Sequence, residues 1–118
     1  MLEKMINAAF KGRNSLSREQ FHHAYFKDCG TPIALVSDVI SILETELGTD
    51  LSRIQAEDDF SGNLRFLFAF DDMVDVSIVW ALEGHFMVSI TDVEAKAMCT
   101  VRDIVNVIRS KSCVPLRS

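Results

Sequence analysis

The chain has 118 residues, of which 48% are hydrophobic and 25% charged, and its formal net charge is −5. This length suits one domain, no apolar run approaches the roughly 20 residues that cross a bilayer, and the N-terminus lacks the apolar centre of a signal peptide. The three cysteines are widely spaced without a Cys-x-x-Cys pair, so we expect thiols in a reducing cytoplasm and no membrane insertion.

The charge is distributed unevenly along the chain. Residues 1–31 carry five Lys/Arg and three Asp/Glu, whereas residues 38–94 carry thirteen Asp/Glu against two Arg. An acidic field of this kind repels nucleic acid and anionic membranes and attracts a basic protein surface. A basic-surfaced protein partner is therefore one interpretation, and an acidic face that only keeps the protein in solution is the other.

The first 31 residues predict two short helices. Apolar residues recur at helical spacing from residue 2 to residue 10, and a Lys-Gly-Arg-Asn run then ends the first helix. The second helix begins at Ser17, with Gln20 as its capping-box partner. We expect an N-terminal helical extension, residues 1–31, which buries its rings on its own bundle or on a second copy in a homodimer. These rings are Phe10, Phe21, Tyr25 and Phe26.

The clearest helix begins at Pro32, with Thr31 as its N-cap, and ends at Gly48. It carries an apolar stripe at steps of three and four residues: Ile33, Val36, Ile40, Leu43 and Leu47. The segment that follows, residues 49–70, is too apolar for an ordinary loop. It must fold back on the core or be covered by a partner.

Another helix is expected from about Asp72 to Glu83, and Gly84 is its natural end. Asp71 and Asp72 fall at its N-terminus, where the helix dipole favours negative charge. Apolar residues of this helix, including Trp80, are expected to face inward or nearly so.

Two capping patterns follow. Thr91 with Glu94 predicts a short helix to about residue 97, and Thr100 with Asp103 predicts a last helix to about residue 111. Residues 113–118 are expected to be a frayed tail. The fold class is therefore all-α, a small helical bundle.

The order and spacing of these helices carry a resemblance to the acyl carrier proteins. The matching stretches are residues 39–48, 54–60, Asp71-Asp72-Met73, the Ala-Leu-Glu-x-x-Phe motif at 81–86, and residues 90–95 and 100–105. The resemblance implies a four-helix bundle over residues 32–112, with a long first loop and a short third helix.

In that family a serine carries 4'-phosphopantetheine, and the motif at residues 81–86 places Asp72 at the serine position. A carboxylate lacks the hydroxyl that forms the phosphodiester, so no prosthetic group is expected unless an unassigned serine is used. Ser61 lies too far upstream, and Ser77 lies on the helix barrel. Three interpretations of Asp72 stay open: a charge mimic of a phosphorylated serine, drift after loss of function, and stabilisation of a helix N-terminus.

The apolar loop suggests how the acyl space of a carrier would be altered. Five residues of loop 60–70 are large enough to fill that space from inside: Leu64, Phe66, Leu67, Phe68 and Phe70. If these side chains are exposed instead, they form a docking patch.

Metal binding and catalysis find no support in the sequence. His22 and His23 are adjacent, so on a helix they diverge by about 100 degrees, and no carboxylate cluster accompanies them. Phosphate loops, nucleophile elbows and zinc spacings are absent. We expect no catalytic residues, no metal site and no enzyme.

The leading hypothesis is a carrier-like protein without the prosthetic group, which acts as an acidic protein-interaction module. The residues expected to contact the partner are Asp71, Met73, Asp75, Trp80 and Glu83. One alternative is a functional acyl or peptidyl carrier in fatty-acid, polyketide or related lipid biosynthesis. A further alternative is an unrelated dimeric helical bundle.

Overall fold

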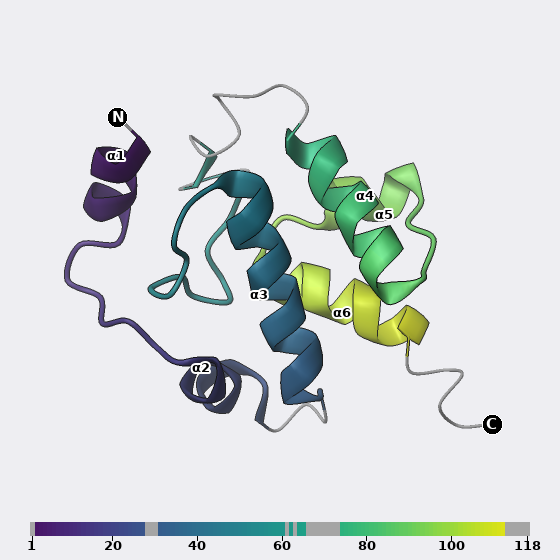
Figure 1. Ribbon diagram of the computed structural model, residues 1–118, viewed down its shortest axis with the longest axis horizontal. Coiled ribbons are helices and arrows are strands. Elements are labelled where there is room, and N and C mark those ends of the chain that lie inside the picture. Colours follow the sequence, from purple (N-terminus) through teal and green to yellow (C-terminus); the bar gives the residue numbers. More distant parts are fainter. Residues whose placement is uncertain (1, 28–30, 61, 63, 66–73, 113–118) are drawn as a thin grey trace.

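The computed structural model describes residues 2–27, 31–60, 62, 64, 65 and 74–112 (Figure 1). The helices in this part of the chain are α1 Leu2–Ala9, α2 Arg18–Tyr25, α3 Ile33–Leu47, α4 Val74–Phe86, α5 Asp92–Ala97 and α6 Val101–Ser112. An isolated antiparallel bridge joins Asp59 to Thr100. The predicted all-α fold class is confirmed.

The core lies where α3, α4 and α6 pack together. Helices α3 and α6 place aliphatic side chains at steps of three and four residues, and α4 is apolar on several faces and buries one of them here. The fully buried members of this set are Val36, Val39, Ile40, Leu43, Leu82, Val101, Val105 and Ile108. Burial of side chains of this size stabilises the fold by about 1.5–3 kcal/mol each, which makes this contact the main source of stability.

The apolar segment after α3 folds back on this core, as far as the structure describes it. Its buried apolar residues are Leu51, Ile54, Ala56, Phe60 and Leu64. The loop therefore adds a layer of the core instead of lying on the surface.

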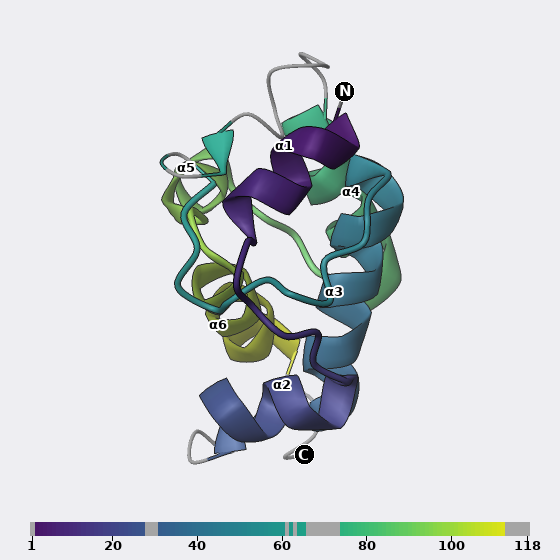
Figure 2. The same ribbon diagram turned by 90° about the vertical axis from the view of Figure 1, so that its left-hand side faces the viewer.

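The N-terminal extension lies on the side of α3 away from α4 and α5 (Figures 1 and 2). Its helix α2 packs against α3, and residues 7–16 contact the loop after α3. Phe10, Phe21 and Phe26 are buried in the same core as α3 and α6, and Tyr25 packs against it. The Leu16 amide also donates to the carbonyl of Ser52 at 2.8 Å. The rings are therefore buried on their own bundle. The division at residue 31 stays a prediction, and residues 113–118 lie outside the described residues.

Several helix ends follow the predicted capping chemistry. Ser17 and Gln20 cap each other at α2, and Thr91 and Glu94 do the same at α5. Gly48 ends α3 in the left-handed region at φ 67°. Glycine adopts this conformation without the steric cost that a Cβ atom imposes.

The predicted N-cap of α3 is wrong. Pro32 occupies the N-cap position, and no side chain caps this helix end. Thr31 is buried, and its hydroxyl accepts a hydrogen bond from Arg109 Nη1 at 3.2 Å. Its carbonyl oxygen lies 2.6 Å from His22 Nε2, which donates to it. Thr31 thus joins α2, α3 and α6, and tertiary contacts have taken the place of the local cap.

The predicted end of α4 at Gly84 is also wrong, because the helix continues to Phe86. Met87, the residue after the helix, has a left-handed φ of 56°, and the Val88 amide donates to the carbonyl of Glu83. Trp80 is 65% exposed and does not face inward. The predicted start at Asp72 lies outside the described residues.

Candidate interaction face and cavity

A cavity of about 490 Å³ lies against α4, α5 and the start of α6. Its floor is apolar and consists mainly of buried side chains from five segments of the chain: Leu43, Phe60, Ile78, Ile90 and Ile104. Cavities of this volume fall in the range that holds small molecules or large side chains. The bundle is therefore less completely packed here than along α3.

The rim of the cavity is amphipathic. Trp80 and Glu83 come from α4, and Asp92 and Lys96 come from α5. Residues three or four apart lie on the same side of a helix, so each pair presents its members together. Trp80 places a large exposed aromatic surface beside two carboxylates and one ammonium group.

Glu83 also shapes the turn between α4 and α5. Its Oε2 accepts a hydrogen bond from the Ile90 amide at 2.8 Å. Two apolar side chains near this turn are strongly exposed, Met87 at 86% and Val93 at 79%. The Glu83 carboxylate is therefore a positioning group for the turn as well as part of the rim.

Helix α5 buries none of its residues fully, and polar contacts help to hold it. Glu94 forms an ion pair with Lys111 of α6 at 2.8 Å. The Lys111 ammonium, followed by the Thr91 amide, holds the pKa of Glu94 below its ordinary value. This ion pair lies at the surface, so its contribution to stability is modest.

A shallower groove lies on the other side of α4, against α3. It has a volume of about 230 Å³ and includes Asp38, Ile42, Glu46 and His85 among its lining residues. His85 Nε2 lies 3.0 Å from Asp38 Oδ2, and both side chains are about half exposed. Pairs this exposed contribute about 0–1 kcal/mol.

The structure places two of the predicted partner-binding residues, Trp80 and Glu83, together at the rim of the cavity. Asp75 belongs to α4, and its side chain is outside the described part of the structure. Asp71, Asp72 and Met73 lie outside the described residues.

The predicted aromatic plug is only partly visible. Leu64 is fully buried in the core, and Phe60, which precedes it, lines the cavity. Phe66, Leu67, Phe68 and Phe70 lie outside the described residues. The filling of the acyl space by this loop stays a prediction.

Two further findings concern only the residues that the structure describes. No three or more His, Cys, Asp or Glu side chains gather there in an arrangement suited to a metal ion. No helix there is long and apolar enough to cross a membrane.

Curated sequences supply the family. No protein-family model matches the chain. It is, however, 36% identical to the acyl carrier protein of Phaeodactylum tricornutum over 66 residues, and this match covers 56% of this chain and 82% of that protein. It is 32% identical over 77 residues to the acyl carrier protein of an Exiguobacterium species, which covers 65% of this chain and 92% of that protein.

The chain belongs to the acyl carrier protein family. The resemblance inferred from the sequence is thereby confirmed, and the alternative of an unrelated helical bundle is wrong. Acyl carrier proteins are carriers and not enzymes, so the expectation of a non-enzymatic chain agrees with its family.

Sequence reasoning missed several residues of this acyl carrier protein relative. Asp92 and Lys96 lie four residues apart on α5, a spacing that indicates one helix face. The sequence pattern there predicted only the helix cap, and it did not predict a contribution to a binding face. Phe60 belongs to a stretch that resembles the family's loop, and that resemblance does not indicate a cavity wall. No local signal connects it to α4, because the contact depends on how the long loop folds back.

Proposed function

We propose that this member of the acyl carrier protein family is not modified with 4'-phosphopantetheine and acts as an acidic interaction module. Attachment of the group requires a hydroxyl, and the register set by residues 81–86 puts Asp72 at the attachment position. Ser77, an alternative, is half-buried within α4, where a synthase has poor access. Ser61, the other alternative, lies outside the described residues.

The observation that carries the proposal is Trp80, 65% exposed at the rim of an apolar cavity. Large aromatic side chains beside a pocket are frequent anchors of protein interfaces. Glu83 and Asp92 on the same rim favour a cationic partner surface over an anionic one. We include Asp75, in the first turn of α4, in the proposed face, and also Asp71 and Met73, which precede this helix in the sequence and lie outside the described residues.

Intact mass spectrometry tests the missing modification. The protein is co-expressed with a broad-specificity phosphopantetheinyl transferase, and its mass is compared with that of the unmodified chain. We expect no change in mass, whereas a pantetheine-sized gain on a serine peptide would contradict the proposal. Asp72→Ser is the converse variant, and it becomes modified if the surrounding surface still binds the transferase.

Binding experiments test the interaction face. Partners are cross-linked to the full chain in a cell extract and quantified for each variant. Trp80→Ala is expected to reduce the yield about tenfold or more, as for an interface anchor, whereas Ile33→Ala, at an exposed apolar position outside the cavity, keeps it. Equal yields for both variants would remove Trp80 from the interface.

Charge is tested separately with Glu83→Gln. Glutamine keeps an acceptor for the Ile90 amide and removes the negative charge, so the turn survives and the attraction weakens. Asp75→Asn should act in the same direction, and added salt should diminish the difference from the unchanged protein. A salt-independent yield would point to an apolar contact alone.

The second candidate is a functional acyl or peptidyl carrier in fatty-acid, polyketide or related biosynthesis. Family membership and the apolar cavity of about 490 Å³ favour it, because the cavity has room for part of an acyl chain. The mass measurement above separates the two candidates.

We further propose a cytoplasmic location and no binding of nucleic acid. A homodimer through residues 1–31 is the alternative to a monomer. Light scattering on the full chain measures its oligomeric state.

A further inference from the structure

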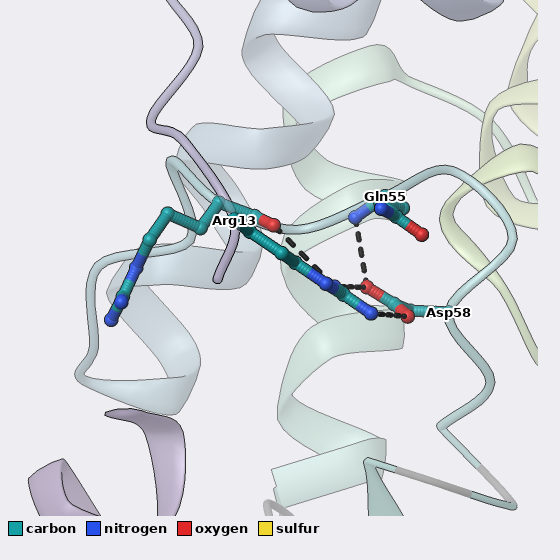
Figure 3. A network of polar contacts seen from close by, with 4 residues as sticks. Arg13, Gln55 and Asp58 are labelled. Carbon is teal, nitrogen blue, oxygen red and sulfur yellow. Dashed lines mark hydrogen bonds and ion pairs between the residues drawn. The ribbon is translucent and has the colours of Figure 1, made fainter. Parts of the chain in front are cut away.

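A polar network joins the segment between α1 and α2 to residues 53–58 (Figure 3). Arg13, from the segment between α1 and α2, places Nη1 2.6 Å and Nη2 3.1 Å from the two carboxylate oxygens of Asp58. The Gln55 amide donates to the same carboxylate at 2.8 Å, and Arg13 Nη1 also reaches the carbonyl of Arg53. We call the Arg13–Asp58 pair and these bonds the clasp.

The clasp is more than a surface ion pair. Asp58 is 5% exposed, so its charge depends on the donors around it. A two-pronged arginine–carboxylate contact is among the strongest polar contacts in proteins. The hydrogen bond to Asp58 raises the pKa of Arg13, which stays charged. Removal of Arg13 takes two donors from a buried carboxylate, and such a loss is costly.

The same arginine holds α1. The Phe10 ring is fully buried, with the Arg13 guanidinium 5.1 Å and the Arg53 guanidinium 5.7 Å from its centre. Arg53 Nη2 also donates to Asn7 Oδ1 at 2.8 Å. Cations over an aromatic ring are attracted to its face. The extension and the segment at residues 53–58 are thus joined by apolar and charged contacts at one place.

From the clasp, a short run of backbone leads to the cavity. Asp59, next to Asp58, forms the isolated bridge with Thr100. The Phe60 amide donates to the Cys99 carbonyl at 2.6 Å, and the Phe60 side chain lines the cavity. A single residue, Asp59, therefore separates the clasp residue Asp58 from Phe60 in the cavity wall.

Helix α6 holds the same segment from its other side. The Arg102 amide donates to the carbonyl of Ala56, and its guanidinium pairs with Glu57 at 2.6 Å. Arg102 also reaches the carbonyl of Tyr25 and lies over the Phe26 ring of the extension. Residues 55–60 are thus held between the extension and α6, and they have little freedom while both contacts persist.

We infer that the N-terminal extension sets the shape of the cavity through the clasp, by holding residues 55–60 so that Phe60 stays in the cavity wall. When the clasp opens, Phe60 and its bond to Cys99 loosen, and apolar molecules enter the cavity more readily. The inference is independent of the proposed function, since it holds whether or not the chain carries a prosthetic group.

Hydrogen exchange on Arg13→Ala tests the coupling, with Arg18→Ala as the matched control. Arg18 belongs to the same extension, but it pairs with Glu44 of α3 at 2.9 Å and not with residues 55–60. We expect the Phe60 amide to exchange about tenfold faster in Arg13→Ala than in the unchanged protein. This corresponds to a free energy of local opening that is lower by about 1.4 kcal/mol. In Arg18→Ala its rate should stay within about twofold. Rates are divided by that of the Leu43 amide, which reports unfolding of the core.

A cavity readout accompanies the exchange measurement. Trp80 is the single tryptophan of the chain and lies on the cavity rim, so its fluorescence reports changes there. Anilinonaphthalene sulfonate, an amphipathic dye that binds accessible apolar surface, should bind Arg13→Ala several-fold more tightly than Arg18→Ala, with a change in the Trp80 signal. Equal dye binding and equal relative exchange in the two variants would overturn the inference.

Two milder variants keep the test valid if Arg13→Ala does not fold. Arg13→Lys keeps the charge and loses the two-pronged contact, and Asp58→Asn keeps an acceptor and loses the charge. If the clasp controls Phe60, the double variant resembles either single variant in exchange and dye binding. Additive effects of the two substitutions would contradict the coupling.

Discussion

The side of the bundle covered by the N-terminal extension and the side formed by α4 and α5 use aromatic and charged residues in opposite ways. On the extension side, Phe10 and Phe26 are fully buried and arginines lie over their rings. On the α4–α5 side, Trp80 is mostly exposed and the core beneath it contains a cavity. The same residue types are therefore structural on one side and accessible on the other.

This difference separates the contacts that stabilise the fold from the face that we propose for binding. Buried rings and nearly buried ion pairs are costly to disturb, whereas exposed side chains change with little effect on folding. The extension therefore adds buried contacts far from α4 and α5, the helices of the proposed interaction face. The predictions below test this separation.

The largest effect is expected from Phe10→Ala. Loss of a fully buried phenylalanine lowers the free energy of unfolding by about 3–5 kcal/mol, because a cavity forms beneath two arginines. Trp80→Ala, at an exposed position, should lower it by less than about 1 kcal/mol. Urea unfolding followed by circular dichroism measures both. Similar losses for the two variants would abolish the contrast between the two sides.

Substitution of two glycines should change the free energy of unfolding by smaller amounts and in opposite directions. Gly48 has a φ of 67°, so Gly48→Ala should lower the free energy of unfolding by about 1 kcal/mol. Gly84 lies within α4, and a Cβ there meets no atom within 4 Å, so Gly84→Ala should raise it by about 0.5–1 kcal/mol. Thermal unfolding reveals the two signs. Destabilisation by Gly84→Ala would indicate a contact on α4 that the structure lacks.

Tyr25→Phe tests the extension side at alkaline pH. Burial, assisted by the nearby charge of Asp58, raises the pKa of Tyr25 above its ordinary value near 10. A raised folded pKa gives stability that is complete below about pH 10 and is lost as the pH rises through the folded value. Tyr25→Phe should therefore unfold with a flatter alkaline dependence. Tyr25 is the single tyrosine, so its ultraviolet absorbance reports its ionisation; titration at the ordinary pKa would contradict the expected burial.

The smallest effect is expected on the α4–α5 side in acid. The pKa of Glu94 is lowered, first by Lys111, so the stability it contributes is present above its ordinary pKa and lost as the pH falls through the folded value. Glu94→Gln should flatten the dependence of the melting temperature on pH below about pH 4.5. Lys111→Ala should flatten it similarly. A steep dependence that survives in both variants would assign it to other carboxylates.

Much of the fold could be predicted because local chemistry decides it. The capping boxes at Ser17 and Thr91 and the glycine stop at Gly48 depend only on neighbours within a few residues. The apolar stripe of α3 likewise follows from helical periodicity. The prediction that Thr31 caps α3 was wrong because its hydroxyl accepts a hydrogen bond from Arg109, 78 residues away in the chain, and not from its own helix.

The candidate site was less predictable. Trp80 and Glu83 were predicted as partner contacts from their place on the expected helix 72–83, and the structure brings them to one rim, but their role in binding stays a prediction. The interpretation of Trp80 as partly inward was wrong, since α4 is apolar on several faces and periodicity alone does not select the buried one. The clasp was missed because Arg13 and Asp58 lie in two separate loops.

By itself, the amino-acid sequence determined the helical class, most helix ends and the acyl carrier protein family, since these depend on short-range spacing and on ordered motifs. Only the tertiary structure decided that the extension covers its own bundle, that Phe60 lines a cavity and that Asp58 is buried against Arg13. Each of these contacts joins separate segments of the chain, as Arg13 and Asp58 do across 45 positions, or depends on which face of a helix meets the core. Such contacts arise from packing, and no local pattern specifies them.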